Sequence, residues 1–131
     1  MSAFSNYLED QITGWIAGTS MTAPTATFVQ LYSQDPTDAG SATGALYSRV
    51  TVASGAGSWT RGTGGAGTIT NASAITITSS ATATASATHF AVFDASATGN
   101  LLFYGALTTS KSIAVGDEVK FNASALTLTV A

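Results

Sequence analysis

The first residue to consider for catalytic chemistry is His89, the only histidine of the chain. It lies in the stretch THFAVFDASATGNLLFYGALT, residues 88–108, together with Asp94. A serine nucleophile needs a base within hydrogen-bond reach and a third group that orients the base. Serines are plentiful here, but no Gly-x-Ser-x-Gly turn between a strand and a helix accompanies them. We therefore interpret His89 as a hydrogen-bonded structural residue and Asp94 as a turn residue. We predict no catalytic residues and no enzymatic activity.

Metal and cofactor sites are not predicted either. The chain has no cysteine, so a metal site would depend on carboxylates. The segment DPTDAG, residues 35–40, lacks the regular oxygen-ligand spacing of a calcium loop. The segment GTGGAGT, residues 62–68, lacks the lysine and the strand-to-helix context of a phosphate-binding loop. The pair Asp117 and Glu118, beside Lys120, is interpreted as a solvated turn.

The charge content is the most unusual feature of the composition. Charged residues make up 8% of the chain, against about 25% in an average soluble domain. A weakly charged surface favours association, because substantial net charge keeps proteins monomeric. The formal net charge is −3, and the basic residues are scattered along the chain: Arg49, Arg61, Lys111 and Lys120. Nucleic-acid binding needs clustered cations, so we predict no nucleic-acid partner.

The first residues give no sign of export. The segment MSAFSNYLEDQ lacks the basic region of a signal peptide and turns acidic at Glu9 and Asp10. No stretch approaches the 18–20 apolar residues, approximately, that a membrane-spanning helix needs. We expect a protein made in the cytoplasm without a signal peptide, and we predict no membrane partner.

The N-terminal segment predicts an amphipathic helix over about 3–17. Apolar residues recur there at spacings of three and four: Phe4, Tyr7, Leu8, Ile12, Trp15 and Ile16. Asn6 and Glu9 can form a capping box, with Ser2 or Ser5 as alternative caps. We interpret the helix as covering one end of the core, as most amphipathic helices do. The alternative is that it docks on a partner subunit.

From Thr25 onward the pattern is alternation, which is typical of strands. We predict strands in several segments that turn-rich sequence separates: 25–33, 45–53, 73–80, both arms of 88–108, 115–121 and 125–130. In the last of these, Leu126, Leu128 and Val130 should share one face. The tract ATATASAT, residues 81–88, fits an extended edge or a loop. The chain is predicted to be one domain over 1–131. An N-terminal amphipathic helix should precede an antiparallel β-sandwich or jelly-roll-like fold over about 24–131.

Two segments predict long loops that reach a neighbouring subunit. One is QDPTDAGSATG, residues 34–44, which is rich in turn-forming residues. The other is glycine-rich, SGAGSWTRGTGGAGT, residues 54–68, and carries Trp59 and Arg61. Trp and Arg are enriched at binding hot spots, so this pair is our candidate partner interface. The alternative is that Trp59 folds back over the edge of the sandwich.

The hairpin over residues 88–108 is apolar on both faces, so both should be covered. We assign the residues to two faces, Phe90, Val92, Leu102 and Tyr104 on one and Phe93, Leu101 and Phe103 on the other. One cover is the opposite sheet, and the other is the N-terminal helix or a neighbouring subunit. We therefore interpret the hairpin as scaffold.

At this point the chain resembles a known family. Four segments resemble small virion proteins of tailed bacteriophages, labelled tail-fibre, head-fibre or capsid-decoration proteins: MSAFSNYLEDQI, TATFVQLYSQDPTDAG, THFAVFDASATGNLLFYGALTTSK and VGDEVKFNASALTLTV. The resemblance runs along nearly the whole chain in the same order. It implies a structural, non-enzymatic virion protein, with no catalytic residues to carry over.

Three functions follow from these observations. The first hypothesis is a decoration or cement protein that binds major capsid subunits and other copies of itself, with a trimer favoured. The second is a tail-fibre or head-fibre module, an adhesin that contacts the host surface. The third is a carbohydrate-binding or hydrolytic β-sandwich. That third function would need an exposed aromatic cluster or two carboxylates about 5–10 Å apart.

Overall fold

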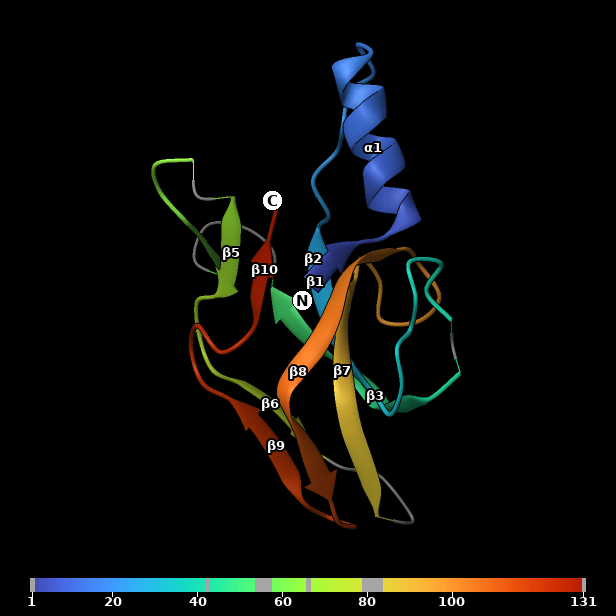
Figure 1. Ribbon diagram of the computed structural model, residues 1–131, viewed down its shortest axis with the longest axis vertical. Coiled ribbons are helices and arrows are strands. Elements are labelled where there is room, and N and C mark those ends of the chain that lie inside the picture. The colour runs from blue at the N-terminus through green and yellow to red at the C-terminus, as the bar shows by residue number, and fades with distance from the viewer. Residues whose placement is uncertain (1, 42, 54–57, 66, 79–83, 131) are drawn as a thin grey trace.

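The computed structural model describes residues 2–41, 43–53, 58–65, 67–78 and 84–130 (Figure 1). These residues form one helix and ten strands, in this order: β1 (Ser2–Phe4), α1 (Asn6–Ile16), β2 (Ala26–Tyr32), β3 (Ala45–Ala53), β4 (Trp59–Arg61), β5 (Thr68–Asn71), β6 (Ile75–Thr78), β7 (Ala85–Phe93), β8 (Leu101–Ile113), β9 (Glu118–Phe121) and β10 (Thr127–Thr129). The predicted mainly-β fold with a short N-terminal helix is confirmed.

The strands form three antiparallel sheets. The largest has the order β1-β8-β7-β2-β3, and the smaller ones have the orders β10-β5-β4 and β6-β9. One apolar core joins all three, because Leu31 and Phe90 of the large sheet pack in the same cluster as Ile77, Phe121 and Leu128 of the small ones. Fully burying one such side chain stabilises the fold by about 1.5–3 kcal/mol. The two small sheets thus face the large one across a common core, a sandwich-like arrangement.

A second, smaller core lies on the other face of the large sheet. Its buried members are Tyr32, Ala91, Phe93 and Leu101. The loop between β2 and β3 covers it: Pro36 is buried, and a Cβ atom added at Gly40 would lie 3.2 Å from that of Leu101. This loop runs beside β7 and β8 (Figure 1). Of the hairpin residues predicted to be covered, Leu102 and Tyr104 are half-buried and the others are buried, and the cover over Phe93 and Leu101 is this loop and not the helix. The 34–44 segment packs on its own domain instead of reaching outward.

A register shift in the hairpin changes which side chains share a face. The pairing of β7 with β8 shifts between Val92↔Phe103 and Phe93↔Leu101. Leu102 is the extra residue there, so Phe103 packs edge-to-face on Phe90 and not beside Phe93. The predicted grouping of Phe103 with Phe93 and Leu101 is wrong for this reason. Strict alternation fails wherever a bulge inserts a residue.

The pairing of β2 with β3 also shifts, between Val29↔Val50 and Leu31↔Leu46. Gln30 lies at the shift. Its side-chain Nε2 donates to the carbonyl oxygens of both Leu46 and Tyr47, at 2.6 Å each. A buried amide thereby satisfies two carbonyl groups at the irregularity, which keeps the strand pair joined there.

The helix differs from the prediction in the residue at which it begins and in what it packs against. It begins after Ser5, whose Oγ accepts a hydrogen bond from the Leu8 amide at 3.2 Å and donates to the Leu101 carbonyl. Residues before Ser5 form β1, which pairs with β8, so the predicted start near residue 3 was too early. None of the helix residues is buried. Figure 1 shows α1 extending away from the sheets, so the interpretation that it covers one end of the core is wrong.

The strands that were predicted from alternating side chains are confirmed: β2, β3, β6, β7, β8, β9 and β10. The glycine-rich segment was wrongly predicted to be one long loop, because its described part contains β4, which pairs with β5. Residues 54–57 and 66 of that segment lie outside the described residues, as do 79–83 of the segments 73–80 and 81–88. Leu126 and Leu128 are buried, whereas Val130 is exposed and does not complete their face.

Candidate interaction site

His89 and Asp94 have local structural partners. The Nδ1 of His89 lies 2.9 Å from the Oγ1 of Thr88. The Asp94 carboxylate accepts hydrogen bonds from the backbone and side-chain nitrogens of Asn100, at 2.7 and 2.8 Å, and so closes the turn between β7 and β8. Within the described part of the chain, no three His, Cys, Asp or Glu residues are grouped so that they could hold a metal ion.

Trp59 and Arg61, the predicted partner contact, point to different surroundings. The Trp59 indole is half-buried and packs edge-to-face on Phe103, with 5.6 Å between the ring centroids. Its Nε1 donates to the Oγ1 of Thr27 at 2.9 Å. Trp59 therefore attaches β4 to the large sheet, while Arg61 is exposed. A partner contact at Arg61 stays a prediction, but Trp59 has an intramolecular role that the sequence left open.

An open groove of about 920 Å³ lies between β8 and β10. It forms because β1 pairs only with residues 103–105 of β8, so that no described strand pairs with the outer edge of β8 beyond them. On the other side, β10 is the outermost strand of its own sheet. Sequence reasoning missed this groove, since it arises where two sheet edges diverge.

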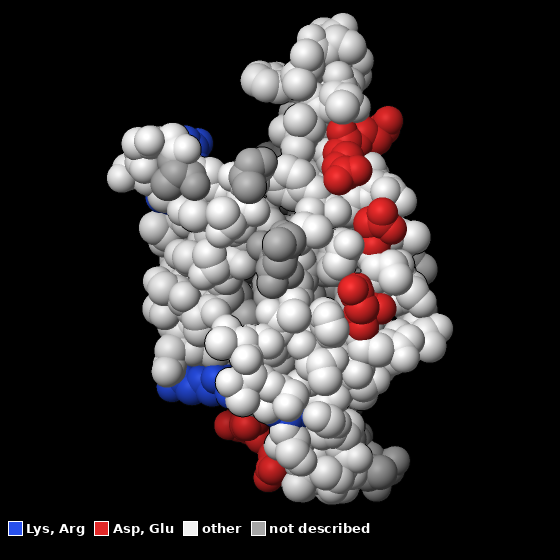
Figure 2. Space-filling view, in the orientation of Figure 1, with Lys and Arg blue, Asp and Glu red and all other residues white. Residues whose placement is uncertain are grey.

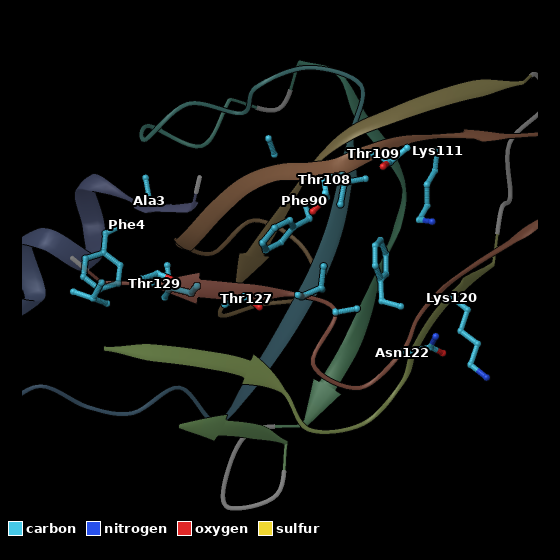
Figure 3. A pocket seen from close by; sticks show the side chains of 17 residues that line it. Ala3, Phe4, Phe90, Thr108, Thr109, Lys111, Lys120, Asn122, Thr127 and Thr129 are labelled. Atoms are coloured by element: carbon cyan, nitrogen blue, oxygen red, sulfur yellow. The ribbon is translucent and has the colours of Figure 1, made fainter. Parts of the chain in front are cut away.

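The two ends of the groove differ in chemistry. Figure 3 shows Phe4 at one end, with Lys111 and Lys120 at the other and the Phe90 ring between them. Small and hydroxyl side chains such as Thr108 make up much of the remaining wall. The described lining residues include these two lysines and no carboxylate. The groove can therefore accept an apolar group at one end and a negative charge at the other.

Beyond the lysines the surface is mixed. Asp117 and Glu118 line a second, shallower hollow with the same Lys111 and Lys120. Asp117 is engaged by its own turn, because its carboxylate accepts a hydrogen bond from the Ala114 amide at 3.1 Å. Lys111 and Lys120 thus line both hollows.

The end of α1 is the most exposed apolar surface of the described chain. Trp15 is 62% exposed and Ile16 is 73% exposed, and Met21 follows in the segment after the helix. We call these three residues the helix end. Among the interpretations of the helix, docking on a partner is the one that such exposure favours, because large apolar side chains rarely cluster on a surface without a function.

The base of α1 belongs to an acidic surface. Burial raises the pKa of the Tyr104 phenol above its ordinary value, and the nearby carboxylates of Asp35, Asp38 and Glu9 raise it further. No cation is among the groups that influence Tyr104. Figure 2 shows acidic residues in a row on one side of the molecule, with lysine and arginine residues on other parts of this view. The carboxylates near Tyr104 thus form an acidic surface at the base of α1.

The family model described as "Podophage GP4 fiber I protein gp80" matches residues 3–129. The chain belongs to this family. The predicted relation to tailed-bacteriophage virion proteins is confirmed, and the protein is a phage structural protein of a fibre family. A search of curated proteins finds no significant match. In the described structure, no helix has the length and apolar character needed to cross a membrane.

Proposed function

We propose that the protein is a non-enzymatic subunit of a podophage tail fibre and acts through protein–protein contacts. The observation that carries this proposal is the family match, which spans residues 3–129 and therefore the whole β fold. Capsid decoration, the first hypothesis from the sequence, is the alternative that an experiment must separate from it. The proposed partners are other copies of the chain and neighbouring tail or capsid proteins, with no nucleic acid, membrane or cofactor involved.

The surface chemistry supports this role. Charged residues make up 8% of the chain, so little electrostatic repulsion opposes assembly. The hydroxyl-rich groove and the exposed helix end offer two places for a protein contact. His89 and Asp94, the first candidates for catalysis, both have structural partners instead. The proposed function thus requires assembly into a particle and no catalysed reaction.

Labelling of phage particles tests the proposal. An epitope tag would be placed in the turn between β8 and β9, at Val115–Gly116, which is exposed and far from both α1 and β10 in Figure 1. Gold-labelled antibody should then bind the tail region of negatively stained particles. A matched particle with the untagged protein is the control for background.

The alternative outcomes are distinct. Label spread evenly over the capsid would overturn the fibre assignment in favour of decoration. If the particles carry no label and the tagged protein stays in the unassembled fraction, the protein is not a component of the virion. For the non-enzymatic part, purified protein incubated with host-surface glycans should release no reducing ends, and release that is lost on changing His89 to Ala would contradict the proposal.

A further inference from the structure

Two surfaces of this molecule are complementary to each other and lie on different parts of it. One is the helix end at Trp15, Ile16 and Met21, and the other is the groove between β8 and β10. Within one chain they do not meet, because α1 extends away from the sheets and from the groove (Figure 1). Each surface is therefore free to contact another molecule.

Two acidic residues of α1 lie behind the helix end. Glu9 lies seven residues before Ile16, about two turns of helix, so both side chains are on the same face. Asp10 follows Glu9, and the α1 sequence contains no basic residue. The helix thus presents an apolar tip and, about two turns behind it, a negative charge.

The groove presents the reverse arrangement. Phe4 supplies apolar surface at one end, and Lys111 and Lys120 supply positive charge at the other. If the apolar tip of the helix lies at the apolar end of the groove, the negative charge behind the tip faces the lysines at the other end. Opposite charges placed across an interface set the orientation of the partner and accelerate encounter.

We propose that the helix end of one copy docks in the groove of a second copy of this chain. The groove has basic and apolar ends, and the helix of this chain has an apolar tip with acidic residues behind it. This complementarity is the reason for choosing a second copy of the chain as the partner. The docked helix would cover the largest exposed apolar side chains of the described structure. This self-contact goes beyond the proposed fibre role, which requires no particular interface between copies.

The contact is heterologous, because two different patches meet. Contacts of this kind generate closed rings when the rotation between copies closes and open filaments when it does not. The trimer favoured from the sequence is one such ring. Each copy in a ring gives one helix end and receives one, so no helix end stays exposed.

Two variants separate the two halves of the contact. The helix variant carries Trp15→Ser and Ile16→Ser, and both positions are exposed, so the fold should persist. The groove variant carries Ala106→Trp, at an exposed position that lines the groove, together with Lys111→Glu and Lys120→Glu. A matched control variant, Val115→Ser, removes an exposed apolar side chain outside both surfaces.

Analytical ultracentrifugation of the full chain over a range of concentrations measures the result. Wild type and the control variant should self-associate, and each surface variant should dissociate with a Kd at least about 30-fold higher, the effect of losing a binding hot spot. Mixed together, the two variants should form a one-to-one complex that grows no further. Only one intact helix end and one intact groove remain in that pair.

Three results would overturn the proposal. They are a wild-type chain that stays monomeric at millimolar concentration, self-association that both surface variants retain, and a mixture in which the variants do not bind each other. Circular dichroism of each variant guards against misfolding as the cause. Particle labelling is independent of the ultracentrifugation assay. A fibre subunit that uses another interface would therefore be labelled on the tail but would not show the predicted effects of the two surface variants.

Discussion

Replacing Trp59 with alanine should destabilise the fold, because its indole packs on Phe103 and donates to Thr27. Truncating a core phenylalanine or tryptophan costs about 3–5 kcal/mol. Trp59 is only half-buried, so we expect the lower end of this range, about 3 kcal/mol. Phe103 is 6% exposed, and Phe103→Ala should cost about 3–5 kcal/mol.

The pair also allows a sharper measurement. An edge-to-face aromatic pair contributes about 0.5–1.5 kcal/mol beyond the area that it buries. The double variant Trp59→Ala, Phe103→Ala should therefore lose about 1 kcal/mol less than the sum of the two single variants. Trp59→Phe keeps a ring and removes the N–H donor, so it should cost about 1 kcal/mol, the net value of a typical hydrogen bond.

Urea unfolding followed by far-ultraviolet circular dichroism gives these free energies, with an unchanged m value as the check on two-state behaviour. A Trp59→Ala variant within about 0.5 kcal/mol of wild type would refute the packing, since that is the ordinary effect of a surface substitution. If the double variant loses as much free energy of unfolding as the two single variants together, the ring contact is refuted but the burial of each ring is not.

Three further predictions concern the caps, the second core and the acidic surface. Ser5→Ala should cost about 1–2 kcal/mol and reduce the helical signal, because it removes the helix cap. Gly40 and Gly64 both have positive φ, but only at Gly40 would a Cβ meet Leu101, so Gly40→Ala should lower the midpoint of urea unfolding more than the control Gly64→Ala. Ultraviolet titration should find the pKa of Tyr104 above its ordinary value. Because the folded protein holds this proton more tightly than the unfolded chain, that contribution to stability is present below about pH 10 and is lost as pH rises through the folded pKa.

Alternation of side chains was the reliable signal in this sequence. It located β2 and β3, where Val29 and Leu31, and Val50 and Val52, recur at every second position. The short strands β1 and β4 carry no such pattern over three residues each. They are strands because β1 pairs with β8 and β4 pairs with β5, and a pattern within three residues does not encode such pairing.

The interaction surfaces illustrate the same limit. Periodicity identified an apolar face on the helix, but nothing in that pattern says whether the face is covered by its own domain or by another molecule. Only Thr60 separates Trp59 from Arg61 in the glycine-rich segment, yet the indole packs on Phe103 while Arg61 is exposed. The groove depends on how far β1 extends along β8, and that extent follows from tertiary contacts.

Electron cryo-microscopy of the intact particle tests the central claim most directly. If the protein is a fibre subunit, its fold of one projecting helix and a five-stranded sheet should fit density in fibres attached to the tail, and that density should be missing from particles made without the gene. A fit of the same fold into regular density over the capsid surface, with tail fibres unchanged in the deletion, would contradict the account.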